Sequence, residues 1–111
     1  MTNILGNGIL YSKAYASTDE VETEALYLSA GAVSIAFEVY LERGGTVRVE
    51  SLGPTGTWRD LTDSSLPAAI GAGETLVLVV PFPLWKAGRL AITPTDATSG
   101  QIDVTGREVL S

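Results

Sequence analysis

An acidic run is the first group of side chains in this chain that could do chemistry. Asp19, Glu20, Glu22 and Glu24 bring four carboxylates together within six residues, and hard cations such as Ca²⁺ are bound by several carboxylate oxygens. The run lacks the spacing and the turn glycine of an EF-hand loop. On a strand, Glu20, Glu22 and Glu24 would line one face, which is typical of a solvated surface. We therefore expect no metal site here.

A second set of carboxylates, Glu38, Glu42 and Glu50, could suggest glycoside hydrolysis, which needs two carboxyl groups in a cleft. These residues fall on the outward face of a predicted hairpin, where we expect Arg48 to pair with Glu38, Glu42 or both. The chain has no histidine and no cysteine. This excludes a histidine base, a cysteine nucleophile, a disulfide and a thiolate metal site. We expect a protein that is not an enzyme and that binds no cofactor.

Aromatic residues offer the remaining ligand chemistry, because rings on a β-sandwich can stack against sugars. The alternative for Trp58 is a place in the core, since it opens a strand after a tight turn. Trp85 lies in an apolar loop, residues 82–86, which could cap one end of the fold or contact a partner. The rings that could form the platform are Trp58, Trp85, Tyr11, Tyr15, Tyr27 and Tyr40.

Composition limits the class of partner. The chain has 111 residues, the length of one domain, with 7 basic and 13 acidic residues and a net charge of −6. A phosphate-tracking protein would need clustered Lys and Arg, so we expect no nucleic acid. No apolar run approaches the roughly 20 residues of a membrane helix, and residues 1–6 do not resemble a signal peptide, so we expect no membrane contact. Mean hydropathy is +0.23 with only 18% charged residues, which indicates that part of the surface is kept for a partner.

The elements that would carry these side chains are strands. Residues 33–42 alternate strictly, with Val33, Ile35, Phe37, Val39 and Leu41 on one side, which is the pattern of a strand with one buried face. Gly44 and Gly45 follow, and residues 46–50 resume the alternation. Two alternating runs about a Gly-Gly centre predict a β-hairpin.

Further strands are predicted on both sides of this segment. Residues 74–81 are β-branched and apolar on both faces, which predicts a central or doubly covered strand. Residues 63–73 predict a loop, and Gly106 predicts a bulge or strand end. For residues 19–28 the alternatives are a strand and a short helix, of which we favour the strand. The other predicted strands are residues 14–16, 23–29, 58–61, 89–93 and 101–105.

Close spacing of short strands predicts an all-β fold, an antiparallel β-sandwich of jelly-roll or Ig-like type or a small barrel, with an extended N-terminal arm. Residues 1–11 form that arm or the first strand, and residues 12–111 form the single sandwich domain. The arm is apolar but interrupted by Gly6 and Gly8, so it would fray unless it docks onto something.

One stretch resembles a family. Residues 47–61, VRVESLGPTGTWRDL, are similar to a motif of small β-sandwich virion proteins of tailed phages, in which a strand leads through a Gly-containing turn to Thr-Trp and Asp-Leu. Residues 88–93 and 102–104 are similar to the closing strands of the same layout, so the resemblance covers residues 33–106. Pro54 departs from the pattern, which has Asp or Asn there. The resemblance implies a head decoration (cement) protein, or less directly a tail or adaptor part, without catalytic residues.

We therefore expect a non-catalytic virion protein, made in the host cytoplasm and located on the capsid surface. It would bind and stabilise the assembled shell as a dimer or trimer, with the major capsid protein or other virion proteins as partners. The alternative is a carbohydrate-binding module of a phage tail or other host-recognition apparatus. The residues predicted to contact the partner are the apolar ones of the arm and of the loop: Ile4, Leu5, Ile9, Leu10, Tyr11, Phe82, Leu84 and Trp85.

Overall fold

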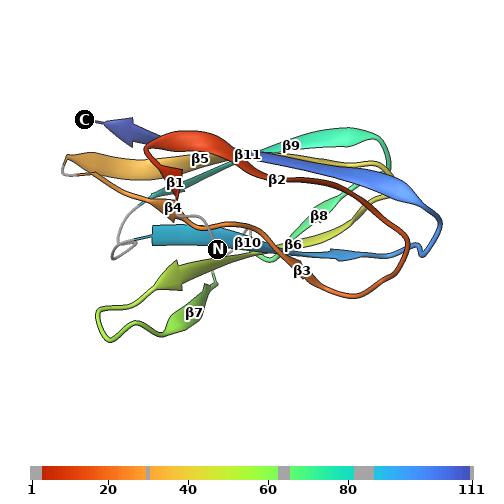
Figure 1. The fold of residues 1–111 in the computed structure, drawn as a ribbon, viewed down its shortest axis with the longest axis horizontal. Coiled ribbons are helices and arrows are strands. Elements are labelled where there is room, and N and C mark those ends of the chain that lie inside the picture. The colour runs from red at the N-terminus through yellow and green to blue at the C-terminus, as the bar shows by residue number, and fades with distance from the viewer. Residues whose placement is uncertain (1–3, 30, 63–65, 82–86, 111) are drawn as a thin grey trace.

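A computed structural model describes residues 4–29, 31–62, 66–81 and 87–110. Their strands form two packed sheets, which confirms the predicted β-sandwich (Figure 1). Among these residues there is no helix, and so none that is long and apolar enough to cross a membrane. The strands are β1 (Ile4–Leu5), β2 (Asn7–Tyr15), β3 (Val21–Glu22), β4 (Leu26–Tyr27), β5 (Ala32–Leu41), β6 (Gly45–Leu52), β7 (Trp58–Leu61), β8 (Ala68–Ile70), β9 (Glu74–Pro81), β10 (Ala87–Pro94) and β11 (Gly100–Leu110).

The smaller sheet has four antiparallel strands in the order β2-β11-β5-β9. The larger sheet follows the order β1-β4-β10-β6-β7, with β3 paired to β10 and β8 paired to β6. Its pairs are antiparallel except for the short parallel contact between β1 and β4. The first two strands belong to different sheets, since β1 lies in the larger sheet and β2 in the smaller one. Gly6, at φ +82°, connects them.

The expected hairpin of residues 33–42 with 46–50 is wrong, although both strands exist. β5 pairs with β11 and β9, whereas β6 pairs with β10, β7 and β8 in the opposite sheet. Both edges of β5 are already occupied, and each strand turns its apolar side to the interior. The Gly44–Gly45 segment therefore carries the chain across the sandwich instead of folding it back within one sheet.

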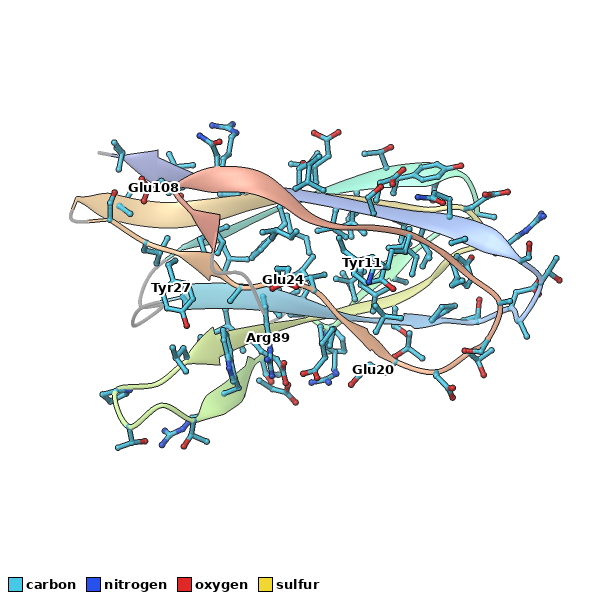
Figure 2. The ribbon with its side chains drawn as sticks, viewed as in Figure 1. Tyr11, Glu20, Glu24, Tyr27, Arg89 and Glu108 are labelled. Atoms are coloured by element: carbon cyan, nitrogen blue, oxygen red, sulfur yellow. The ribbon has the colours of Figure 1, made fainter. Side chains whose placement is uncertain are left out.

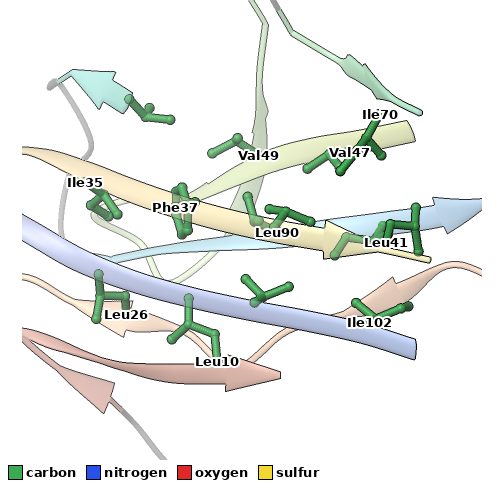
Figure 3. Packing of buried hydrophobic residues seen from close by; sticks show 14 of the residues in the cluster. Leu10, Leu26, Ile35, Phe37, Leu41, Val47, Val49, Ile70, Leu90 and Ile102 are labelled. Atoms are coloured by element: carbon green, nitrogen blue, oxygen red, sulfur yellow. The ribbon is translucent and has the colours of Figure 1, made fainter. Parts of the chain in front are cut away.

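The core lies between the sheets and follows the predicted alternation of β5. Ile35, Phe37, Val39 and Leu41 are fully buried, while Val33 at the start of the strand is 43% exposed. Opposite them lie buried residues of the larger sheet, among them Val47, Val49 and Leu90 (Figure 3). The alternation thus places one apolar row per strand in a common interior.

β9 differs from its prediction. It is an edge strand of the four-stranded sheet, paired only with β5 among the described strands, so the central-strand alternative is wrong. Its inner residues Leu76 and Leu78 pack against the core, while Val77 and Val79 on the other side are 61% and 62% exposed. The second apolar row of β9 is therefore exposed in the single chain, and its cover by a partner stays a prediction.

β11 continues past Gly106 to Leu110, so the prediction that Gly106 is a bulge or strand end is also wrong. The register shift against β2 lies between Val104 and Thr105. Gly106 keeps the inward phase of Ile102 and Val104, and an added Cβ would meet Leu10 Cδ1 at 2.8 Å. The glycine therefore makes room for the Leu10 side chain in the core.

The acidic segment and the predicted loop also contain strands. Residues 19–28 form no helix, and they contain the short strands β3 and β4, which residues 23–25 separate. The buried Thr23 binds β10 twice, because its N–H donates to Leu90 O at 2.9 Å and its Oγ1 accepts the Leu90 N–H at 3.0 Å. Within residues 66–73, predicted as loop, β8 adds three paired residues to the edge of β6.

Candidate functional site

The outer face of the seven-stranded sheet carries a network of ion pairs. Arg89 of β10 binds Glu50 of β6 at 2.8 Å and Glu22 of β3 at 2.7 Å. Its guanidinium also lies over the Trp58 ring, 4.1 Å from the centroid. The Arg89 and Glu50 side chains are each only 13% exposed, so this pair is better shielded from solvent than an ordinary surface ion pair. Figure 2 shows Arg89 on the side of β10 that points away from the four-stranded sheet.

A second arginine extends the network. Arg48 donates to Glu20 at 2.8 and 3.0 Å, pairs with Asp60, and lies 3.7 Å from Glu50. The hydrogen bond to Glu20 raises the pKa of the Arg48 guanidinium, which therefore stays charged. The predicted pairing of Arg48 with Glu38 or Glu42 is wrong, because β5 and β6 lie in different sheets.

The carboxylates that were considered for catalysis or metal binding lie apart among the described residues. Glu38 lies on the outer face of the four-stranded sheet, Glu50 belongs to the network on the other sheet, and Glu42 accepts the Gln101 N–H at the sheet crossing. Glu20 and Glu22 are bound by arginines. Over the described ranges, no group of three or more Asp or Glu side chains is placed to hold a metal ion.

The aromatic residues of the alternative sugar-binding platform are dispersed. Trp58 is half-buried under Arg89 on the larger sheet, Tyr40 lies on the outer face of the smaller sheet, and Tyr15 is buried with its hydroxyl accepting the Arg43 N–H. Tyr11 packs against the core, and Lys13 Nζ lies over its ring, 5.6 Å from the centroid. Tyr27 is half-buried on β4. Trp85 lies outside the described residues.

The outer face of the four-stranded sheet has a different character, and we call its central part the open face. Directly opposed residues form two neighbouring rows across the four strands β2, β11, β5 and β9. Three apolar side chains of these rows are more than half exposed: Ile9 at 66%, Val77 at 61% and Val79 at 62%. The first row is Ile9, Thr105, Glu38 and Val77, and the second is Asn7, Arg107, Ala36 and Val79.

A hollow of about 380 Å³ is formed on this face. It is lined by Gly8, Gly106 and Ala36, which have little or no side chain, and by Ile9, Val77, Glu38 and Arg107. No ion pair within the described part of the chain involves Glu38 or Arg107. The open face therefore combines exposed apolar groups with one uncompensated charge of each sign, whereas both arginines of the network on the opposite face are paired with carboxylates.

The structure distributes the predicted partner residues differently. Ile9 belongs to the open face. Leu10 is 1% exposed and lies in the core, so it is not an interface residue of the folded chain, and Tyr11 also packs inward. Ile4 and Leu5 form β1, paired to Leu26 and Tyr27. Phe82, Leu84 and Trp85 lie outside the described residues.

Sequence reasoning did not assign Val77, Val79, Glu38 and Arg107 to a site. The signal for the two valines was the double-sided apolar pattern of residues 74–81. No comparable signal joins Glu38 to Arg107, because they are 69 positions apart. Only the pairing of β5 with β11 makes them neighbours.

Comparison with known proteins gives a fold match. No family model and no curated protein matches the chain. The crystal structure of the PBSX exported protein XepA superposes with a TM-score of 0.73 at 14% sequence identity, over 95% of this chain and 37% of the XepA chain. This chain thus spans little more than a third of that protein, and the likeness establishes a shared β-sandwich fold.

Proposed function

We propose that this chain is a non-enzymatic structural protein of a phage-related particle, a head decoration protein that binds the assembled shell as an oligomer. The open face carries the proposal. Exposed apolar side chains at Ile9, Val77 and Val79, on a sheet face with a hollow lined by the first two, are typical of a surface that another protein covers. The fold match to the phage-related XepA and the sequence resemblance to small virion sandwiches support the same assignment.

The mechanism follows from mass action. A protein that binds the assembled shell but not its dissociated subunits lowers the free energy of the shell by its own binding free energy. No reacting side chain is needed for this. A rigid sandwich that turns one apolar face to a neighbour and a charged face to solvent is suited to such a role.

Rebinding to stripped particles tests the proposal. Particles of the phage or prophage that encodes this chain would be depleted of it, incubated with the purified protein, and separated from unbound protein by sedimentation. We expect the protein to co-sediment and the shell to melt at a higher temperature. Intact, folded protein that neither co-sediments nor changes the melting temperature would overturn the proposal.

Matched variants assign the effect to one face. Val79→Lys places a charge on the open face, and Thr46→Lys places the same charge on an exposed β6 position of the opposite sheet. We expect Val79→Lys to weaken rebinding by about tenfold or more, since burying an unpaired ammonium is costly. Thr46→Lys is expected to leave rebinding within about twofold of wild type. Equal loss in both variants would show that rebinding does not depend specifically on the open face.

A further inference from the structure

The open face also carries two opposite charges, and a two-fold axis in the plane of the face nearly exchanges their positions. Glu38 and Arg107 lie on adjacent strands and in adjacent rows, so they occupy one diagonal of the face. Ile9 and Val79 occupy the ends of the other diagonal. With strands about 4.8 Å apart and rows about 6.8 Å apart, Glu38 and Arg107 lie about 4 Å on either side of the Ile9–Val79 line.

This geometry suits a two-fold axis. An axis lying in the plane of the face along the Ile9–Val79 line exchanges the positions of Glu38 and Arg107 to within about 1.5 Å on the flat grid. Two copies packed about that axis would bring each Glu38 opposite an Arg107, and this contact would occur twice. Ile9 would meet its own counterpart at one end, and Val79 would do so at the other.

We propose that the open face is the interface of a homodimer in which two copies of this chain pack sheet to sheet. The proposal deepens the function proposed above by naming the occupant of the face. The interface buries Ile9, Val77 and Val79 and closes two reciprocal Glu38–Arg107 ion pairs. The hollow over Gly106 and Ala36 gives room for the long arginine side chain of the second copy.

A second copy fits better than an unrelated partner because neither charge has a partner within the described chain. Covering Glu38 and Arg107 with another protein removes water from both charges. This costs free energy unless the covering surface supplies an opposite charge at each of the two positions. The open face of a second copy, rotated about the two-fold axis, supplies both opposite charges.

The size of the face sets the expected affinity. Four strands about 4.8 Å apart, and eight residues of about 3.4 Å each along β9, give a face of about 19 by 27 Å. This lies below the roughly 800 Å² per partner of a standard interface. We therefore expect a dimer with a dissociation constant in the micromolar range, rather than an obligate one.

Charge-swap variants test the inference in the full-length chain. Sedimentation velocity from roughly 5 to 500 µM would give the dimer dissociation constant of wild type, of Glu38→Arg, of Arg107→Glu and of the double swap. Each single reversal turns two attractions into two repulsions, so we expect at least about tenfold weaker dimerisation. The double swap is expected to restore the wild-type value to within a fewfold, with circular dichroism confirming that all variants are folded.

The outcomes separate this inference from the proposed function. A wild-type chain that stays monomeric over the whole range, or a double swap that fails to restore dimerisation, overturns the homodimer. If the single reversals leave self-association unchanged but abolish rebinding to particles, the face contacts the particle directly, and the homodimer is wrong while the structural role stands. If the charge swaps change dimerisation as expected but the protein does not rebind to particles, the homodimer is supported and the structural role is overturned.

Discussion

Alanine at position 45 is expected to destabilise the fold, because Gly45 lies where the chain crosses between the sheets. A Cβ on this residue would come within 2.3 Å of Thr93 O, 2.9 Å of Leu41 Cδ2 and 3.0 Å of Pro94 Cα. Two of these contacts are with backbone atoms of β10, which cannot rotate away. The neighbouring Gly44 has φ +85°, and its carbonyl accepts the Thr95 N–H at 3.2 Å.

The size of the effect follows from these contacts. Relieving the clash requires β6 and β10 to separate by at least 0.7 Å, the difference between 2.3 Å and the 3.0 Å that Cβ atoms tolerate. Overpacking of this kind costs about 1–3 kcal/mol, and losing the hydrogen bond from Thr95 adds about 1 kcal/mol. We expect a total loss of about 2–4 kcal/mol, or a fall in Tm of roughly 9–17 °C.

Urea unfolding followed by circular dichroism would measure this loss. Gly56→Ala is the control, since Gly56 has open space around it and a φ of +84°, so a Cβ there meets no neighbouring atom. We expect that control to lose only the strain of a positive φ, about 1–2 kcal/mol. If Gly45→Ala unfolds at the wild-type denaturant concentration, or loses no more than Gly56→Ala, the sheet crossing described here is wrong.

Three further predictions concern the core, the ion-pair network and pH. Phe37→Ala should cost about 3–5 kcal/mol of unfolding free energy, because the ring is fully buried between the sheets; a loss under about 1 kcal/mol would contradict that position. Arg89→Met should cost about 1–3 kcal/mol because it leaves Glu50 without its closest cation, and adding Glu50→Gln should recover part of it, whereas equal losses in both variants would disprove the coupling. Hydrogen bonds from the hydroxyl and N–H of Ser29 lower the pKa of Glu108. Their stabilisation is therefore present above the ordinary value of 4.5 and is lost as the pH falls through the lowered one. The melting temperature of Ser29→Ala should then lie below wild type at neutral pH and converge with it in acid, and a constant difference across this range would refute the assignment.

The strands could be predicted wherever one face is buried and the other is not. Alternation over residues 33–42 identified the row that fills the core, because a two-residue period leaves one solution for a strand with a single buried side. The same pattern could not say which strands pair. A hairpin and a sheet crossing both satisfy the alternation of residues 33–50, and only the occupied edges of β5 decide between them.

The candidate site was harder to predict for the same reason. Residues 74–81 indicated an apolar row in excess of what one core face needs, which pointed to surface for a partner. Its location on the outside of an edge strand depends on strand order, which short-range sequence patterns do not contain. Glu38 and Arg107 are neighbours only through the pairing of β5 with β11. Conversely, the apolar N-terminal residues looked like surface, yet Leu10 fills the space above Gly106 in the core.

An image of the particle at a resolution that allows this sandwich to be fitted would test the central claim most directly. The account predicts density for the chain on the particle, with the open face of β2-β11-β5-β9 covered by neighbouring protein. It also predicts that the face carrying Arg48 and Arg89 is turned to solvent. A particle that lacks the chain, or one in which Val77 and Val79 face solvent while the arginine face is buried, would contradict it.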